Sequence, residues 1–251
     1  MASEKRFGYE WDVYTEMDPN HEIQFKRWLG PINRDFIKGK RILDAGCGMG
    51  RNSYWALKWG AKEVVAFDND PRTVASARKT LSSFSNVDVA EKSIYDIEYR
   101  NEFDLAFSIG VIHHLADQRL GVEKMIEAVK PGGMVLVWLY GKEGNEKILW
   151  FLEPLRKYVT SHLPVGFLYI FTYAFSIPFW IMLKVFRPAG AYYQQLQTFS
   201  FHHIHGIIFD QLLPKIAKYY TQDEARELLH GLQNITLTRV NGMSWTVTGI
   251  K

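Results

Sequence analysis

The sequence predicts a doubly wound α/β fold, a mostly parallel sheet with helices on both of its faces. Short apolar runs alternate with longer mixed segments over the first half of the chain, which is the pattern of successive βαβ units. A glycine-rich turn follows the first apolar run, and two β-like runs joined by a tight turn close the chain. In folds of this class ligands bind at the carboxyl ends of the strands, so the functional residues are expected there.

Strands and helices are expected to alternate up to residue 140. The predicted strands are residues 41–45, 63–67, 87–89, 103–109 and 134–140. The predicted helices are residues 51–59, 71–81 and 118–129. Pro71 suits a first helical position, where its missing N–H costs little. The sequence Lys130-Pro131-Gly132-Gly133 is expected to end the third helix and turn into the next strand.

The C-terminal residues add a helix and a hairpin. Thr221 is followed three residues later by Glu224, a capping box that predicts a helix over residues 221–232. Two β-like runs, residues 235–240 and 244–250, are joined by Asn241-Gly242, the strongest short-range signal for a hairpin. With this antiparallel pair the sheet is expected to have seven strands.

Composition limits the class of protein. The chain has 251 residues, enough for one substantial core but too few for two independent enzymatic domains. Its net charge of +3 provides no strong polyanion-binding surface, so no nucleic-acid partner is expected. Cys47 is the single cysteine, which favours a reducing compartment, and the N-terminal residues lack the apolar run of a signal peptide. We therefore expect a cytoplasmic protein.

Residues 141–220 interrupt the alternation of strands and helices. Twelve aromatic residues fall within residues 163–201, so this part differs in composition from the rest. We interpret it as an α-helical, aromatic-rich insertion over the ligand edge of the sheet. The expected organisation is an N-terminal aromatic cap (1–37), a core (38–140 and 221–251) and this insertion (141–220).

The turn after the first predicted strand contains Gly46, Gly48 and Gly50 and is preceded by Asp44. Glycines let the backbone approach a ligand closely, and the start of the next helix supplies free N–H groups. A dinucleotide site is one alternative, but its fingerprint is G-x-G-x-x-G and not G-x-G-x-G. An acid aimed into the turn would repel a pyrophosphate and suits the ammonium end of an amino-acid-like ligand. Asp68 ends the next strand, where a carboxylate can accept hydrogen bonds from both ribose hydroxyls.

Four motifs together make the chain resemble the class I S-adenosylmethionine-dependent methyltransferases, in particular those that act on small molecules such as ubiquinone and menaquinone precursors. These motifs are LDAGCGMGR, VVAFDND, FDLAFSIGVIHHL and VKPGGMVLVW, in the family's order and spacing. The resemblance covers at least residues 38–140 and 221–250. It implies a Rossmann-like sheet and S-adenosyl-L-methionine as the cofactor. By position, the residues around the methionine part would be Asp44, Gly46 and Gly48, while Asp68 would bind the ribose and Asn69 would lie beside the adenine.

The same resemblance implies further cofactor contacts. Ser93, with Ile94 next to it, stands where the family often has an acid facing the adenine, and Asp96 is the alternative alignment. Ser108 and Ile109 end the fourth predicted strand and would lie near the sulfonium.

An aromatic stretch precedes the first predicted strand. In related methyltransferases this segment often folds over the cofactor. Tyr14 or Trp11 would then contact the methionine moiety, and Arg51 would anchor its carboxylate or the substrate. Packing of the aromatic residues on the edge of the sheet is the alternative.

Methyl transfer from a sulfonium needs alignment and exclusion of water, and a general base only if the acceptor must lose a proton. His113 follows the fourth predicted strand, near the expected position of the methyl group. His205 lies on the inward face of a predicted helix over residues 198–213, whereas His203 points away. Both His113 and His205 are candidate bases, and for both a buried packing residue is the favoured alternative. No metal site is expected, because no cysteine or acidic ligand pattern accompanies the histidines.

Residues 163–186 form a 24-residue apolar run with one charge, Lys184, which is long enough to span a membrane. A single span is not expected, because the strands before and after the run return to one sheet and basic residues flank both of its ends. One interpretation is an element in the membrane interface, with Phe175 and Trp180 against lipid, and the other is a lid over an internal pocket.

The expected function is transfer of a methyl group to a small, apolar or lipid-like acceptor, such as a quinone, lipid, polyketide or lipid-linked sugar. The reaction is expected in the cytoplasm, with a peripheral position on the inner face of the membrane as an extension. The alternatives are an RNA or protein methyltransferase, a non-methylating enzyme of the same fold, and a cofactor-binding partner subunit.

Overall fold

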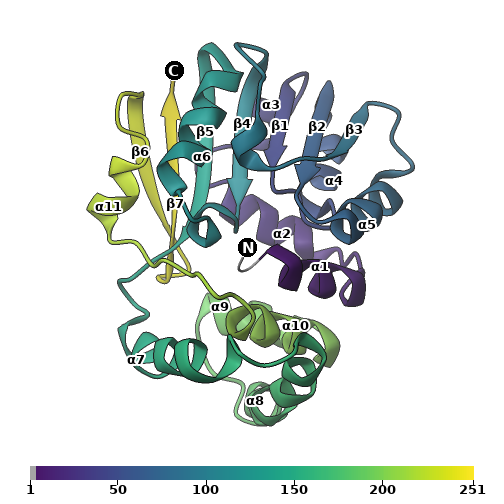
Figure 1. The fold of residues 1–251 in the computed structure, drawn as a ribbon, viewed down its shortest axis with the longest axis vertical. Coiled ribbons are helices and arrows are strands. Elements are labelled where there is room, and N and C mark those ends of the chain that lie inside the picture. The colour runs from purple at the N-terminus through teal and green to yellow at the C-terminus, as the bar shows by residue number, and fades with distance from the viewer. Residues whose placement is uncertain (1–3) are drawn as a thin grey trace.

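The computed structural model describes residues 4–251, and its seven strands form one sheet (Figure 1). The strands are β1 (Arg41–Ala45), β2 (Glu63–Asp68), β3 (Val87–Glu91), β4 (Phe103–Ile109), β5 (Val129–Tyr140), β6 (Gln233–Val240) and β7 (Ser244–Ile250). Their order is β3-β2-β1-β4-β5-β7-β6. Strands β1 to β5 pair in parallel, and β7 runs antiparallel to both of its neighbours. The predicted fold class is confirmed.

Helices precede the sheet, connect its strands and form a separate layer. Those before the sheet are α1 (Glu4–Val13), α2 (Asn20–Trp28) and α3 (Arg34–Ile37). Those between the parallel strands are α4 (Arg51–Lys58), α5 (Pro71–Leu81), η1 (Ile94–Asp96), η2 (Ile112–His114) and α6 (Gln118–Ala128). Those after β5 are α7 (Glu146–Leu155), the π-helical turn η3 (Arg156–Thr160), α8 (Val165–Val185), α9 (Ala191–Thr198), α10 (Phe201–Leu212) and α11 (Gln222–Glu227).

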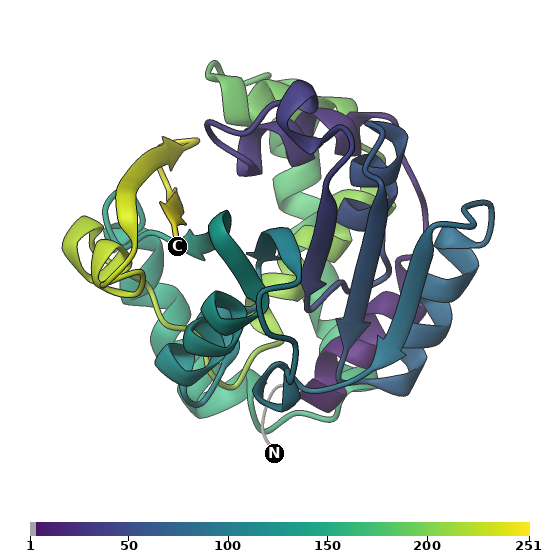
Figure 2. The same ribbon diagram turned by 90° about the horizontal axis from the view of Figure 1, so that it is seen from above.

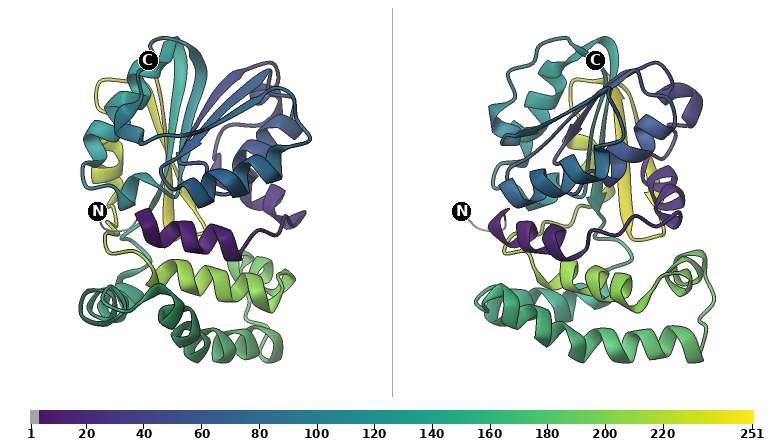
Figure 3. Two further views of the ribbon diagram at one scale, coloured as in Figure 1. Left: turned by 45° about the vertical axis from the view of Figure 1, so that its right-hand side comes forward. Right: turned by 90° about the vertical axis from the view of Figure 1, so that its right-hand side faces the viewer.

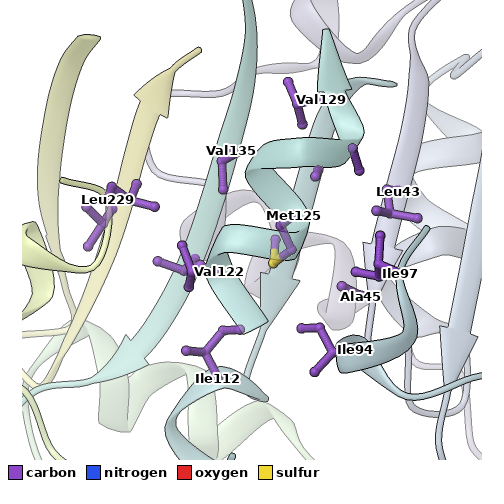
Figure 4. Packing of buried hydrophobic residues seen from close by; sticks show 14 of the residues in the cluster. Leu43, Ala45, Ile94, Ile97, Ile112, Val122, Met125, Val129, Val135 and Leu229 are labelled. Atoms are coloured by element: carbon purple, nitrogen blue, oxygen red, sulfur yellow. The ribbon is translucent and has the colours of Figure 1, made fainter. Parts of the chain in front are cut away.

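Both faces of the sheet are covered, as Figure 2 shows from above. Because side chains alternate along a strand, Leu43 and Val65 pack toward α6 and α11, while Ile42 and Val64 pack toward α2, α4 and α5. Figure 4 shows the first of these two layers, where Met125 of α6 lies among aliphatic side chains from the strands and from η1. The strands are therefore apolar on both sides, which is why they appear in the sequence as continuous apolar runs.

Several helix and strand ends lie where local sequence signals predict them. Pro71 is the first residue of α5, and the Asp70 carboxylate accepts the N–H of Arg72 at 2.9 Å as the N-cap. The Thr221–Glu224 capping box is present, although α11 ends at Glu227 and is shorter than predicted. Asn241 and Gly242 have φ values of 53° and 71°, the two positive values of a type I′ turn, which the Met243 N–H closes by donating to the Val240 carbonyl at 3.1 Å.

The predicted turn at residues 130–133 is wrong. The strand β5 begins at Val129, directly after α6, and these four residues belong to it. The pairing with β4 shifts between Phe103–Val129 and Leu105–Met134, so the extra residues bulge out of the ladder. Gly132, with a φ of 77°, permits the bulge.

The insertion lies beneath the carboxyl ends of the parallel strands (Figure 1). Its two ends meet at the end of β5, where the Tyr220 N–H donates to the Tyr140 carbonyl at 2.9 Å and the Lys142 N–H donates to the Tyr220 carbonyl at 2.8 Å. Helices α1, α10 and α8 follow one another as layers below the sheet (Figure 3), and α10 contacts both α1 and α8.

The apolar run forms α8. Among the residues that the structure describes, α8 is the one helix long and apolar enough to cross a membrane, and 17% of its most apolar window is buried. Both ends of the insertion return to the same point of the sheet, as expected from the sequence.

Gly46 gives a test of how tightly the turn after β1 is packed. Its φ is 83°, and an added Cβ would lie 2.5 Å from Cγ2 of Val111. Gly39 also has a positive φ, 74°, but an added Cβ there meets no atom within 4 Å. Gly39→Ala should therefore cost about 1–2 kcal/mol from backbone strain alone, and Gly46→Ala should cost about 1–3 kcal/mol more from overpacking.

Urea unfolding measures both free energies. Adding Val111→Ala to Gly46→Ala should recover the packing part of the loss and leave the backbone part. Equal losses for Gly39→Ala and Gly46→Ala would contradict the close contact with Val111.

Candidate active site

A cavity of about 700 Å³ lies at the carboxyl edge of the sheet. Its walls come from the turns after β1, β2 and β4, from α1, and from the insertion. Of the residues predicted to bind the cofactor, those that line it are Tyr14, Gly46, Gly48, Arg51, Asp68, Asn69, Ser93, Ile94 and Ile109. One cavity thus brings together residues that are up to 95 positions apart in the sequence.

Two backbone hydrogen bonds hold the turn after β1 against the neighbouring strand β2. The N–H groups of Gly46 and Cys47 both donate to the Phe67 carbonyl, at 3.0 Å and 2.9 Å. Gly50 is the N-cap of α4 and gives no side-chain hydrogen bond, so the first N–H groups of this helix stay available to a ligand. An added Cβ on Gly48 would lie 3.2 Å from the ring of Trp11, so this glycine keeps the cavity open beneath α1.

Cys47 also lines the cavity, from within the turn. Its side chain is buried, and Sγ lies 3.4 Å from the Gly48 carbonyl. Burial, followed by the nearby charges of Asp44 and Asp68, raises the pKa of the thiol well above its ordinary value. The thiol is therefore protonated and a weak nucleophile.

Asp44 lies behind the turn and does not line the cavity. It is fully buried, one of its oxygens accepts the Ser53 hydroxyl at 2.6 Å, and the other has no partner. Burial raises the pKa of Asp44 to about 7. The unpartnered oxygen leaves this carboxyl able to accept one further hydrogen bond.

Asp68 and Asn69 reach the cavity at the end of β2. The Asp68 carboxylate accepts the Gly48 N–H at 3.0 Å, which joins the two predicted cofactor-binding turns. Burial raises the pKa of Asp68 to about 6, against the opposing effect of its backbone hydrogen bonds. The Asp68 carboxylate is thus held at the cavity wall and can accept further hydrogen bonds from a ligand.

The positions after β3 and β4 differ in their access to the cavity. Ser93 caps η1, because its hydroxyl accepts the Tyr95 N–H at 3.3 Å, and it lines the cavity together with Ile94. Ile109 lines the cavity as well. Ser108 does not: it is buried, and its hydroxyl donates to the Ala45 carbonyl at 2.7 Å, a bond between neighbouring strands.

The helix α1 covers the glycine turn. The guanidinium of Arg51 lies 5.4 Å from the centre of the Trp11 ring, as a cation–π pair, and both residues line the cavity. Tyr14 lines it too, and its hydroxyl forms a hydrogen bond with Nδ1 of His205. Helix α1 and the residue that follows it thus place Trp11 and Tyr14 against the cavity.

The candidate histidines lie elsewhere than expected. His205 and His113 are buried, but neither is among the residues lining the cavity, whereas His203 and His114 are. The prediction that His203 points away is therefore wrong. Helix α10 lies between α8 and the cavity, so two of its faces are covered. His205 lies on the face toward α8, where it contacts Tyr169, and His203 lies on the face toward the cavity. Burial lowers the pKa of His205 to about 4 and that of His113 well below its ordinary value.

Two acids that the motifs did not indicate face the cavity. Asp210 of α10 accepts the Tyr140 hydroxyl at 2.8 Å, and Glu10 of α1 is buried with one oxygen unpartnered. Burial raises the pKa of both, and Asp210 raises that of Glu10 further, while Arg51 acts in the opposite direction on each. A signal for Asp210 was available, because it is the one acid between residues 154 and 222.

The cavity thus has a polar part near the glycine turn and an apolar part next to the insertion. The apolar part is walled mainly by aromatic and aliphatic side chains, among them Phe151, Leu152, Phe175, Phe179 and Phe199. Among residues 4–251, no group of three histidine, cysteine or acidic side chains is placed to hold a metal.

Comparison with known proteins identifies the family. A family model described as a methyltransferase domain matches residues 42–133. The ubiquinone biosynthesis O-methyltransferase of Aromatoleum aromaticum is 31% identical over 160 residues, which cover 62% of this chain and 67% of that protein. The tRNA U34 carboxymethyltransferase of Cellvibrio japonicus is 35% identical over 151 residues, which cover 52% of this chain and 46% of that protein. Across such curated relatives the chain spans from a third to two thirds of their length.

A solved structure matches over nearly the whole chain. It is a SAM-dependent methyltransferase of Thermotoga maritima, described as a possible histamine N-methyltransferase. It is 14% identical, has a TM-score of 0.55 and covers 92% of this chain and 91% of its own, a likeness of fold. From the sequence match, the four motifs and the sheet order, we conclude that the chain belongs to the class I S-adenosylmethionine-dependent methyltransferases, enzymes whose methyl group comes from S-adenosyl-L-methionine.

Proposed function

We propose that this methyltransferase acts on a small, apolar or lipid-like acceptor, such as a quinone, lipid, polyketide or lipid-linked sugar, in the cytoplasm and at the inner face of a membrane. The observation that carries the proposal is the cavity, whose far part is built by the insertion from aromatic and aliphatic side chains. Pockets of this size and lining take small ligands that are largely apolar. The ubiquinone-pathway relative is consistent with such an acceptor.

The polar end of the cavity fits the cofactor. We assign the ribose hydroxyls to Asp68, the adenine to Asn69, Ser93 and Ile94, and the methionine end to Gly46, Gly48, Arg51 and Tyr14. The fit rests on the open glycine turn, on the unpartnered oxygen of Glu10 and on the unpartnered Nε of Arg51. Asp44 and Ser108 would act from behind the wall, by fixing the turn and the end of β4. When bound, the cofactor supplies an electrophilic methyl group on its sulfonium.

We propose Asp210 as the group that takes a proton from the acceptor, in place of His205 or His113. Asp210 faces the cavity, and the Tyr140 hydroxyl fixes its orientation. Burial raises its pKa above that of an ordinary carboxyl, so Asp210 holds an abstracted proton more readily than an exposed aspartate would. The two histidines lie outside the lining and hold their proton weakly. For them, packing is the better explanation.

Substitution of Asp68 tests the cofactor site. Asp68→Ala should weaken binding of the cofactor by ~1.5–3 kcal/mol, about 10- to 150-fold, because a charged acceptor of the ribose hydroxyls is lost. Affinity of the unaltered protein should fall as the pH is lowered through about 6, since protonation removes that charge.

Calorimetric titration with S-adenosylhomocysteine measures both effects. Asp68→Asn should lose this pH dependence, and Asp88→Asn, at an exposed carboxylate of β3, should keep both affinity and pH dependence. An unchanged dissociation constant for Asp68→Ala would remove Asp68 from the site.

The acceptor class is tested with a cofactor carrying a labelled methyl group. Incubated with a cell extract, the enzyme should label a molecule extractable into organic solvent, identified by its mass, and not tRNA or protein. Asp210→Asn should lower the labelling about 100-fold, as for loss of a general base, with little change in cofactor affinity. Asp223→Asn, at an exposed carboxylate in the first turn of α11 and outside the cavity lining, is the matched control. Label recovered in tRNA would overturn the proposed acceptor and favour the activity named for the tRNA-modifying relative.

A further inference from the structure

The insertion presents an apolar outer face to solvent. We define the outer face by large apolar residues of α7, η3, α8 and its C-cap that are at least 46% exposed and do not line the main cavity, which are Trp150, Tyr158, Phe167, Ile170, Ile177, Ile181, Val185 and Phe186. Their exposed fractions run from 46% for Ile177 to 84% for Trp150. Helices α7 and α8 share a buried cluster that includes Leu152 and Leu168, so this face is formed by packed helices.

The exposed residues of α8 form a stripe along one side of the helix. Phe167, Ile170, Ile177 and Ile181 recur at intervals of three, seven and four residues, which keeps them on one side. The buried residues Leu168, Thr172, Ser176 and Leu183 lie on the opposite side, toward α10. A soluble helix of this kind normally carries polar residues on its outer side, so the stripe requires a partner.

The charge of the insertion indicates which partner covers this face. From residue 154 to residue 209 the chain has no aspartate or glutamate, whereas it has Arg156, Lys157, Lys184 and Arg187. Lys157, Lys184 and Arg187 are exposed next to apolar residues of the outer face. An apolar surface rimmed by cations complements a bilayer with anionic headgroups.

A second hollow, of about 470 Å³, lies at the start of the outer face. Its lining includes Arg156, Lys157, His162 and Lys215, with one carboxylate, Glu153. It adjoins Tyr158, which belongs to the same turn as Lys157 and is 69% exposed. Cationic side chains around a hollow of this kind suit a phosphate group.

The outer face is continuous with the mouth of the main cavity. Ile148 and Phe151 of α7 line that cavity, yet they are 50% and 54% exposed. A lipid-like molecule that enters past these two residues meets apolar side chains at the cavity mouth.

We propose that the outer face docks in the interface of an anionic bilayer, with a headgroup phosphate in the hollow at Lys157 and Lys215 and the cavity mouth turned to the lipid. This deepens the proposed function and rests on it, because it names the membrane as the source of the acceptor. It also corrects the residues expected to meet lipid. Phe175 and Trp180 are half-buried, and Phe175 lines the cavity, so neither belongs to the outer face.

Flotation with vesicles tests the docking without any acceptor. The full chain should float with vesicles of phosphatidylcholine mixed with phosphatidylglycerol, stay at the bottom with phosphatidylcholine alone, and be released by raised salt. Ile170→Ser with Ile177→Ser should abolish flotation, whereas Leu120→Ser on α6, also an exposed apolar residue, should not. Because all three side chains are exposed, these variants should keep their melting temperature and their affinity for S-adenosylhomocysteine.

The headgroup site has its own pair of variants. Lys157→Gln and Lys215→Gln should each lower partitioning about five-fold, as one basic residue near an anionic surface contributes. Lys62→Gln, at the far edge of the sheet, should change it little. Replacing chloride by inorganic phosphate at constant ionic strength should leave flotation unchanged, because a headgroup is held together with the apolar contact of the outer face, which the free anion lacks. Displacement by phosphate would show that the hollow takes the free anion, and would overturn the headgroup assignment.

Three results would overturn the docking itself. One is failure to float with any vesicle. The second is retention on vesicles in alkaline carbonate, which indicates a spanning helix. The third is a dimer in sedimentation that Ile170→Ser and Ile177→Ser convert to monomer, which would make the outer face a contact between copies of the chain. If instead the protein floats but labels only water-soluble acceptors, the docking stands and the proposed acceptor class fails.

Discussion

The pairing of Tyr220 with the end of β5 determines how the rest of the molecule is arranged. Two backbone hydrogen bonds, from Tyr220 to Tyr140 and from Lys142 to Tyr220, bring both ends of an 80-residue insertion to one point of the sheet. The helices between them are therefore held over the carboxyl edge, where the ligand site of such a sheet lies. The closure also keeps both ends of α8 on the same body, with its exposed apolar side facing outward.

That closure also creates the electrostatic character of the cavity. Glu10, Arg51 and Asp210 come from α1, from the start of α4 and from α10, and all three line the same cavity. In such surroundings charges interact more strongly than in water, and each carboxyl holds its proton more tightly. The cavity thus combines an apolar wall, which suits a lipid-like molecule, with a few polar groups near the expected position of the cofactor.

The sequence predicted the sheet well because its signals are local. Successive side chains of each strand pack on opposite covered faces of the sheet. Pro71 and Thr221 mark helix starts and Asn241-Gly242 marks the hairpin, and each of these signals spans only a few residues. The cofactor-side residues followed from motifs of the same kind. The acceptor side did not, because the partners there are distant in sequence: Tyr140 and Asp210 are 70 residues apart. Helical periodicity placed His205 on a buried face of α10, but it could not show that this face meets α8, nor that the face with His203 lines the cavity.

The buried position of Cys47 has a practical consequence. It is the chain's single cysteine, it is enclosed under the glycine turn, and its thiol is held in the unreactive protonated form. A fluorophore or spin label can therefore be attached to a cysteine introduced on the surface of α8 with little competition from the native thiol. The native sequence needs no prior alteration for measurements of how deeply each part of that helix enters a bilayer.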